Sequence, residues 1–351
     1  MVLVYFYHLF CSNLVINTFF PEAKGIEKVA NYLLSPIHYL CEGKEVIYNQ
    51  NTGKYILKQR FDYHEAKLLR TPFALTFFSP SLALGGGLKY LSLCLGNAKE
   101  RHEELKRELL STKVQSNIPY YFSLGLEVND YKLGAKLLPQ GYTRREKDKE
   151  NLKPEKSALA EILRLLHKHQ IPCWLDCGSC LGAYRYGGVI PWDYDLDMSV
   201  LASDFENVRH ALNELDQKKY IVQDWSNRNR PQTYLRVYVK ETRNHIDIYH
   251  NAIDPQSRLI SYIISNEESN FLLEEWKIRE RECAKPISFE TIFPLKRGEF
   301  DGIEVPLPND TETYLKSKYG PNIEPARLFD EKTGTYEKDP SHPYWKIPLT
   351  N

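Results

Sequence analysis

Apolar positions after residue 156 follow first a helical and then an extended repeat. Between residues 157 and 167 the apolar side chains recur every three or four positions, which predicts an amphipathic helix. Short apolar or alternating segments at 171–175, 233–239 and 245–249 predict strands, and a second helix is expected over 204–215. This succession predicts an α/β (α+β) fold with a mixed sheet and flanking helices.

Two stretches in the first half of the chain are almost free of charge. Residues 1–20 carry no charge, but polar side chains interrupt the apolar run and no basic segment precedes it, so we expect a buried helix or strand. A membrane anchor is the alternative. Residues 71–96 have Lys89 as their sole charge and contain Pro72, Pro80 and three consecutive glycines. These breakers predict a glycine-rich buried turn, with a membrane-surface segment as the alternative.

The charged composition of residues 139–156, which are bounded by prolines, is typical of a linker. We therefore expect a smaller accessory region at 1–138, a catalytic domain at 157–330 and a C-terminal tail at 331–351.

Charge and cysteine content narrow the class of protein. The 46 Lys and Arg residues balance the 46 Asp and Glu residues, so the chain lacks the basic excess with which most nucleic-acid binders collect phosphates. No nucleic-acid partner is expected. The seven cysteines are an odd number in a chain too long to need disulfides, which favours a reducing, cytoplasmic location.

Acidic residues form the most informative pattern in the chain. Asp193, Asp195 and Asp197 stand at alternate positions, so on a strand they would share one face, where three like charges need a compensating cation. Asp247 lies between apolar neighbours on its own predicted strand, and its side chain is expected to converge on the Asp195 and Asp197 pair. Hard oxygen ligands of this kind suit Mg²⁺ or Mn²⁺. The ordinary alternative is a solvated strand edge or turn.

Several separated segments resemble the LicD/fukutin family. Its signature is similar to residues 175–185 (LDCGSCLGAYR) and 190–197 (IPWDYDLD), and its C-terminal part is similar to 292–295, 300–302, 305–308 and 314–320. The resemblance covers roughly residues 157–320 and implies a nucleotidyltransferase-like fold. It also implies transfer of phosphocholine, ribitol phosphate or glycerol phosphate from a CDP-activated donor to a glycan acceptor.

The resemblance also implies roles for the acidic residues. It makes Asp195, Asp197 and Asp247 the catalytic, metal-binding carboxylates, with Asp193 as a further neighbour of the metal.

Contacts to the donor phosphates are expected from five residues. Gly178 and Ser179 would lie against the diphosphate, since a larger side chain at the glycine would hold it away. Arg185, Lys296 and Arg297 are candidate phosphate contacts, with exposed ion pairs as the alternative.

Two cysteines depart from the family pattern. Cys177 stands where many members carry glycine, and Cys180 where many carry leucine. Buried thiols are expected there rather than zinc ligands, because no clear fourth ligand lies nearby.

Other functions compete with alcohol-phosphate transfer. One is transfer of a nucleotide onto a protein, and another is a catalytically degenerate binding module. Peripheral membrane association is a further expectation for the first half of the chain, and the alternative location is an anchored protein of the secretory pathway.

Overall fold

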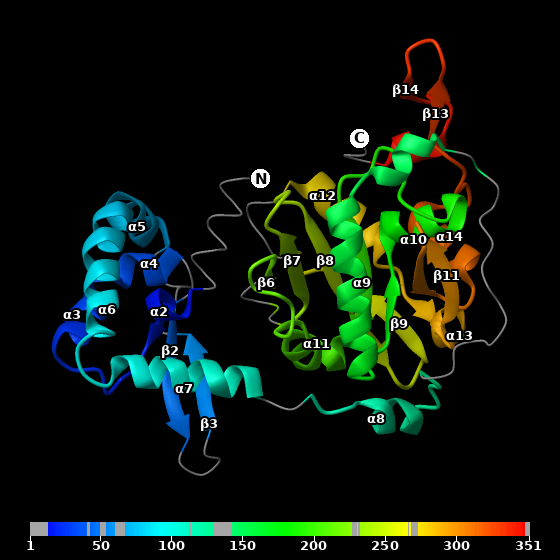
Figure 1. Cartoon of the computed structure of the whole chain (residues 1–351). Coiled ribbons are helices and arrows are strands. Elements are labelled where there is room, and N and C mark those ends of the chain that lie inside the picture. Colours follow the sequence, from blue (N-terminus) through cyan, green and yellow to red (C-terminus); the bar gives the residue numbers. More distant parts are fainter. Residues whose placement is uncertain are drawn as a thin grey trace. The chain divides into compact units, whose positions relative to one another are not determined.

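The computed structural model shows two compact units, residues 1–113 and 114–351, each of which we describe by itself (Figure 1). It describes residues 13–40, 43–49, 54–59, 67–111, 114–128, 142, 144–226, 230, 232–265, 267 and 273–347.

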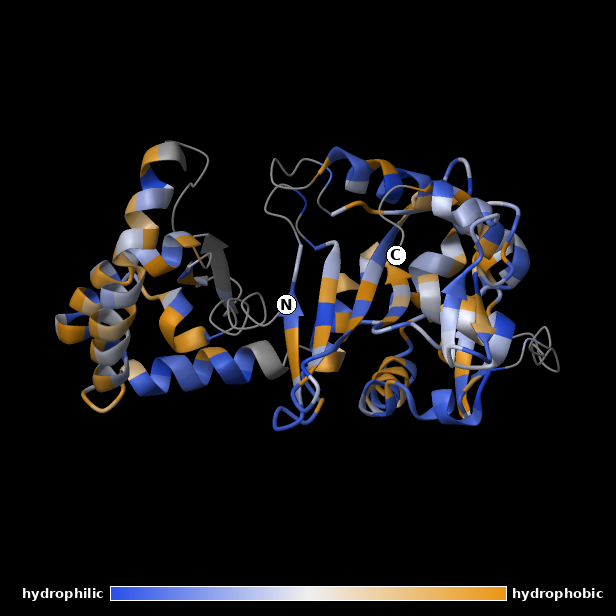
Figure 2. Ribbon diagram, turned by 90° about the horizontal axis from the view of Figure 1, so that it is seen from above, coloured by the Kyte–Doolittle hydropathy of each residue, from blue (hydrophilic) through white to orange (hydrophobic). Residues whose placement is uncertain are grey.

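The first unit combines helices with a small three-stranded sheet of order β1-β2-β3. Its helices are α2 (Leu14–Asn17), α3 (Gly25–Leu33), α4 (Ser35–Leu40), α5 (Lys67–Pro80), the π-helix η1 (Ser81–Gly86), α6 (Gly87–Ser92) and α7 (Ala98–Ser111). Its strands are β1 (Thr18–Phe19), β2 (Lys44–Asn49) and β3 (Lys54–Gln59). Figure 2 shows that α7 is hydrophilic along most of its length.

The glycine-rich turn predicted at 71–96 is wrong, because this segment is helical through α5, η1 and α6. Gly85 is buried, and a Cβ at this position would approach Cγ of Leu34 to 2.9 Å. The glycine therefore allows η1 to pack closely beside α3 instead of ending the helix.

Within the part of the chain that the structure describes, no helix combines the length and the apolar character needed to cross a membrane. Residues 13–20 form a short helix and a short strand, as expected, and the remainder of the 1–20 stretch lies outside the described residues. The expected cytoplasmic location stays a prediction.

The second unit is built on a seven-stranded mixed sheet, which confirms the predicted fold class. The sheet order is β10-β9-β8-β5-β4, with β7 pairing with β8 and β6 pairing with β7. The β5–β8 pair is parallel and the other pairs are antiparallel. The strands are β4 (Cys173–Leu175), β5 (Leu196–Leu201), β6 (Tyr220–Asp224), β7 (Tyr234–Val239), β8 (His245–Asp254), β9 (Leu259–Tyr262) and β10 (Ile287–Ser288).

Helices and two hairpins surround this sheet. Those that shape the site are α9 (Lys153–Lys168), α10 (Cys177–Tyr186), α12 (Glu274–Cys283) and α14 (Thr311–Tyr319). The others are α8 (Ile118–Ser123), η2 (Glu146–Glu150), η3 (Ala202–Asp204), α11 (Phe205–Leu212), α13 (Phe289–Ile292) and the hairpin β11 (Lys296–Phe300) to β12 (Ile303–Leu307). The predicted helices correspond to α9 and to η3 with α11.

The division between the units falls earlier than the linker expected at 139–156. Tyr121 and Leu126 are buried in the core of the second unit, and the Tyr121 hydroxyl donates to Asp204 Oδ2 at 2.5 Å. Within the expected linker, Arg144 pairs with the buried Asp301. The expected linker is rich in charges, but some of these charged side chains form ion pairs inside the second unit.

The segment expected to be a C-terminal tail is also part of this unit. It forms the hairpin β13 (Arg327–Asp330) to β14 (Thr335–Lys338) and the short helix η4 (Pro343–Lys346). The Tyr336 hydroxyl donates to Asp148 Oδ2 at 2.6 Å, which ties the hairpin to η2.

Candidate functional site

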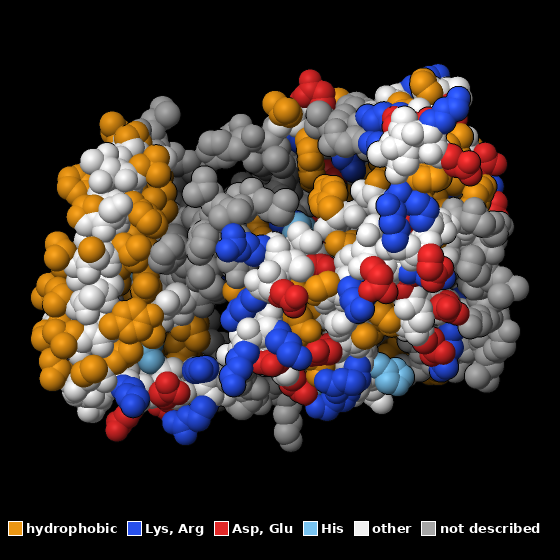
Figure 3. Space-filling view, turned by 45° about the horizontal axis from the view of Figure 1, so that its top comes forward, with side chains coloured by type: hydrophobic (Ala, Val, Ile, Leu, Met, Phe, Trp, Pro, Cys, Tyr) orange, Lys and Arg blue, Asp and Glu red, His pale blue; other side chains and the backbone are white. Residues whose placement is uncertain are grey.

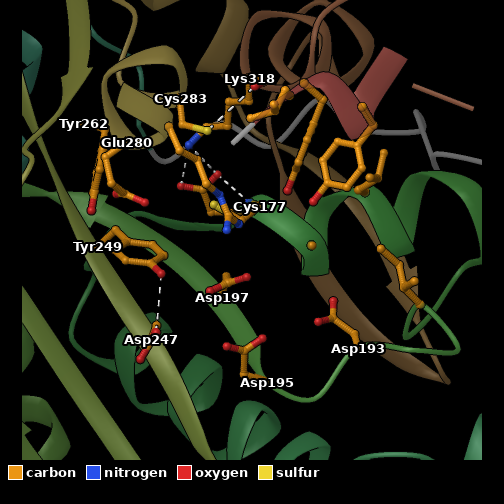
Figure 4. A pocket seen from close by; sticks show the side chains of 18 of the residues that line it. Cys177, Asp193, Asp195, Asp197, Asp247, Tyr249, Tyr262, Glu280, Cys283 and Lys318 are labelled. Carbon is orange, nitrogen blue, oxygen red and sulfur yellow. Dashed lines mark hydrogen bonds and ion pairs between the residues drawn. The ribbon is translucent and has the colours of Figure 1, made fainter. Parts of the chain in front are cut away.

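A cavity of about 560 Å³ opens where β5 begins, and its wall combines carboxylates with aromatic rings (Figure 4). The four aspartates proposed from the sequence all line it: Asp193, Asp195, Asp197 and Asp247. Aromatic side chains from distant parts of the chain complete the wall, including Trp225, Tyr249, Tyr262, Tyr319 and Tyr344.

Strand pairing brings the acidic residues together. Asp197 is the second residue of β5, and its direct partner on the parallel strand β8 is Asp247. The predicted convergence is therefore confirmed, although the reason given for Asp193 and Asp195 is wrong. Both precede β5, because the chain there forms a turn at residues 191–192 before the strand starts.

Three of the lining side chains are close enough to share one cation. One ligand atom from each of Asp195, His245 and Asp247 lies within 4.8 Å of the others. His245 Nε2 is 3.7 Å from Asp195 Oδ2 and 3.6 Å from Asp247 Oδ2. Imidazole nitrogen and carboxylate oxygen are both ligands of Mn²⁺ and related divalent ions. Asp197 lies outside this trio but faces the same cavity (Figure 4).

Arg236 already holds one of these carboxylates in place. It stands opposite Asp247 on β7 and donates from Nε and Nη2 to the two carboxylate oxygens at 2.6 and 2.9 Å. The Tyr249 hydroxyl donates to Asp247 Oδ2 at 3.4 Å. A bidentate guanidinium contact neutralises Asp247 and fixes its orientation, so the uncompensated negative charge is concentrated on the other aspartates.

The pKa values of these other aspartates are raised, as expected for buried carboxylates that lie close together. Burial, followed by the charge of Asp195, raises the pKa of Asp193 to about 7. Burial and the charge of Asp247 raise the pKa of Asp195 to about 6. The pKa of Asp197 is raised well above its usual value by burial and by the same neighbouring charges. A divalent cation would favour the ionised forms again, so the donor set fits such an ion.

Gly178 lies beside these carboxylates at the start of α10. A Cβ at this position would collide with the Asp193 carboxylate, so the glycine makes room for that side chain. Ser179 is buried, and its hydroxyl accepts a hydrogen bond from the Asp197 backbone N–H at 2.8 Å. Ser179 thus positions Asp197 and does not line the cavity.

A buried ion pair anchors the start of the same helix. Asp176 caps α10 by accepting from Cys177 N–H at 2.6 Å, and its carboxylate also lies 2.8 Å from Lys318 Nζ. Burial alone would raise the pKa of Asp176, but Lys318 and the hydroxyls of Ser199 and Tyr314 hold it below its usual value. Helix α14 is thereby joined to the first turn of α10, which carries Gly178.

The three basic residues proposed as phosphate contacts are placed differently. Arg185 lines the cavity, but its Nε donates to the carbonyl of Ile323 at 2.7 Å and its Nη2 donates to the carbonyl of Glu324. Lys296 and Arg297 lie on β11 and are not among the residues that line the cavity. Arg297 pairs with Glu304 at 3.1 Å across the hairpin, which matches the ion-pair alternative.

Cys180 is buried as expected, whereas Cys177 is half-buried and lines the cavity. Cys173 and Cys180 are buried free thiols, and burial raises the pKa of both. Among the described residues, the group that could hold a metal contains no cysteine. Cys177 has φ of +43°, in the left-handed region that favours glycine, so the backbone geometry suits the glycine that the family resemblance places there.

Arg236 and Lys318 are site residues that the sequence-based proposal did not include, and it did not count His245 among the metal ligands. Arg236 interrupts the apolar run of β7, and His245 is two positions from Asp247 on the same strand, so both left a pattern that alternation could have detected. Lys318 left no such signal, because α14 shows no clear separation of polar and apolar faces in its sequence.

The second unit thus combines a mixed α/β fold with an acidic cavity. Residues 170–310, within the second unit, match the family described as "LicD/FKTN/FKRP, nucleotidyltransferase domain". The resemblance noted in the sequence is confirmed.

Relatives of this chain come from bacteria and mammals. An uncharacterized protein of Rickettsia prowazekii (strain Madrid E) is 27% identical over 155 residues, which are 44% of this chain and 50% of that protein. The ribitol 5-phosphate transferase FKRP of Homo sapiens is 23% identical over 167 residues, 46% of this chain and 30% of that protein. The ribitol-5-phosphate transferase FKTN of Homo sapiens is 34% identical over 55 residues, 16% of this chain and 12% of that protein. The chain thus spans half the length or less of these relatives.

Among solved structures, the lincomycin-bound lincosamide antibiotic adenylyltransferase LnuA aligns with 52% of this chain and 100% of that chain. The TM-score is 0.27 at 14% identity, and both values are too low to bear on function.

Proposed function

We propose that the second unit transfers a phosphate-linked alcohol from a CDP-activated donor to a hydroxyl of a glycan, with Mg²⁺ or Mn²⁺ bound at the aspartate cluster. The observation that supports this most is the convergence of Asp195, Asp197 and Asp247 on one cavity without enough positive charge to balance them. The names of the mammalian relatives make ribitol phosphate the first alcohol to test, followed by glycerol phosphate and phosphocholine.

The cation would be held by Asp195, His245 and Asp247, with Asp197 and Asp193 beside it. Such an ion neutralises the charge of a diphosphate donor and thereby favours departure of CMP. Direct attack of the acceptor oxygen on phosphorus needs no covalent enzyme intermediate, which agrees with an acidic rather than a nucleophilic centre.

The residues of the chain itself orient the reactants. Arg236 fixes the Asp247 carboxylate, and Ser179 fixes the backbone at Asp197. The Asp176–Lys318 pair holds the first turn of α10 at the cavity. Tyr194 lines the cavity and is 64% exposed, so its ring is available for a pyrimidine base to stack on.

Asp193 is placed to accept the proton that the attacking hydroxyl of the acceptor releases, because it lines the cavity beside Asp195 and does not belong to the trio that would hold the cation. Its pKa is about 7 in the metal-free protein, and a bound cation would lower that value and so favour the ionised carboxylate.

A ligand screen followed by product analysis tests the proposal. Thermal stability is measured with CDP-ribitol, CDP-glycerol, CDP-choline, CTP and ATP, each with and without Mg²⁺, because a ligand that binds the native state raises its stability. We expect a CDP-alcohol to stabilise the protein only with the metal, and the effect to vanish in Asp195→Ala. Release of CMP in the presence of a glycan acceptor then identifies the reaction.

Other outcomes would replace the proposal. Stabilisation by a nucleoside triphosphate alone, with pyrophosphate as product, would establish nucleotide transfer. The absence of any stabilisation would favour a catalytically degenerate binding module.

A further inference from the structure

We infer that the first unit binds the surface of a lipid bilayer through one apolar side of its continuous helix α5–η1–α6. The inference concerns a surface outside the catalytic cavity and goes beyond the proposed reaction.

Large apolar side chains recur along this helix at spacings of four or seven residues. They are exposed by 44% to 79% of their surface, and together we call them the apolar face: Leu69, Phe73, Phe77, Leu84 and Leu91 on the helix, and Leu95 just after its end. The rings of Phe73 and Phe77 lie 4.6 Å apart, as expected for neighbours one turn apart on the same side of a helix. A monomeric protein in water rarely exposes so extended an apolar surface.

The same segment buries its charged residue and two of its serines. Lys89, the sole charged residue between Arg70 and Lys99, is completely buried, and Ser81 and Ser92 are buried with it. Figure 3 shows the result on the first unit, where apolar and uncharged atoms cover the visible face and charged side chains begin only at the edge formed by α7.

The buried lysine has a complete set of partners inside the unit. Its Nζ donates to Glu27 Oε1 at 3.1 Å, to Asn31 Oδ1 at 2.6 Å and to the carbonyl of Thr18 at 3.1 Å. Burial alone would raise the pKa of Glu27, but His102 and Lys89 lower it to about 2, so the pair stays ionised. The charge is therefore withdrawn from the surface and neutralised, which leaves the outer side of the helix without charge.

A buried charge together with exposed phenyl and leucyl groups is the distribution expected for a helix whose surroundings are apolar. A protein partner would require hydrogen-bonding or charged groups around the contact, whereas hydrocarbon requires none. Arg70 and Lys99 stand just beyond the two ends of the uncharged segment, where cationic side chains can meet lipid headgroups.

The helix offers only one side to the lipid. Its other side packs against α3 and carries the buried Lys89, so it cannot be surrounded by hydrocarbon. The geometry therefore points to a segment that lies in the headgroup and acyl boundary.

Vesicle flotation of the full-length protein tests this inference. Wild-type protein is expected to float with phosphatidylcholine vesicles, and about 1 M salt should not release it, because screening weakens charge contacts but not apolar ones. The variant carrying Phe73→Glu and Leu84→Glu should lose at least about tenfold of its vesicle affinity.

A matched variant in the second unit serves as the control. Phe122 is 73% exposed on α8, and Phe122→Glu should float like the wild type. Thermal unfolding verifies that all variants fold, since the substituted side chains are exposed.

Three results would overturn the inference. These are no flotation of the wild type, equal loss of flotation in the Phe122→Glu control, and flotation of the Phe73→Glu and Leu84→Glu variant at the wild-type level. A dimer in light scattering that does not float, and that becomes monomeric in the same variant, would assign the apolar face to a second copy of the chain.

Discussion

The two units of this chain distribute polar and apolar side chains in opposite ways. The second unit packs an extensive apolar core around its mixed sheet and places acidic residues around a cavity. The first unit has small apolar clusters, encloses a charged network around Lys89 and exposes phenylalanine and leucine along one helix. These burial patterns agree with the proposed reaction in an aqueous cavity of the second unit and with the proposed contact of the first unit with lipid.

Both units contain a buried lysine–carboxylate pair, and the difference between the pairs is instructive. Lys318 and Asp176 are 5% and 0% exposed and join two elements next to the cavity. Lys89 and Glu27 are 0% and 3% exposed and remove a charge from an apolar helix. The same interaction thus anchors a helix beside the cavity in one unit and keeps a charged side chain away from the surface in the other.

The largest effect that tests this comparison is loss of the reaction. Asp195→Ala and Asp197→Ala should each lower the transfer rate at least about a thousandfold, which corresponds to about 4 kcal/mol of activation free energy. Circular dichroism should remain close to that of the wild type. As a control, Asp216→Asn changes an exposed aspartate of the same unit and should leave the rate unaltered. Turnover by both alanine variants near the wild-type rate would refute the assignment.

The buried pairs predict separate effects on stability. Lys318→Met leaves Asp176 ionised without its partner and should destabilise the second unit by about 3 kcal/mol. Lys89→Met should have a similar effect on the first unit. Calorimetry should show that each substitution lowers its own unfolding transition. If both substitutions lowered the same single unfolding transition, the two units would not unfold independently.

Removing a negative charge from the cavity should raise the stability of the second unit, by less than the loss of a buried pair lowers it. Asp197→Asn keeps the shape of the side chain but removes a like charge, so it should stabilise the metal-free protein by about 1 kcal/mol while abolishing transfer. Chemical denaturation in the presence of a chelator measures the change. Destabilisation would show that the aspartate cluster is already neutralised by other groups.

The pH dependence should be the mildest of these effects. The pKa values of Asp193 and Asp195, about 7 and about 6, lie above the ordinary value of 3.8, so the folded state binds more protons than the unfolded state between these limits. These two groups therefore make the metal-free protein less stable as pH rises from about 4 to about 7. Stabilisation by Mg²⁺ should increase over the same interval, because the cation competes with those protons.

Melting curves with and without the metal measure this dependence. A variant with Asp193→Asn and Asp195→Asn removes both titrating groups and should flatten it. Stabilisation by Mg²⁺ that decreases toward neutral pH would contradict the expected sign.

The sequence predicted well the parts of the second unit that depend on local alternation. The strands predicted at 233–239 and 245–249 correspond to β7 and β8. Asp247 stands between apolar neighbours, and this pattern predicted that its side chain lies near Asp197, which is its partner in the β5–β8 pair. These features follow from the twofold repeat of a strand, which the residues themselves display.

Features that depend on long-range packing were not predictable in the same way. Lys318 lies 142 residues from its partner Asp176, and Arg185 binds backbone carbonyls more than a hundred residues away. The charged segment at 144–148 resembles a linker because composition does not reveal that its arginines have partners. The glycines at 85–87 resemble a turn because the close approach of α3 is absent from the sequence.

The most direct test of the central claim is a titration of Mn²⁺ into the full-length protein followed by electron paramagnetic resonance. The wild type should bind one ion, and CDP-ribitol should alter the signal of the bound ion. Asp195→Asn should weaken this binding at least about tenfold, whereas Asp216→Asn should leave it unchanged. Equal Mn²⁺ binding by the wild type and Asp195→Asn would contradict the account, because the aspartate cluster would then not be the site of the cation.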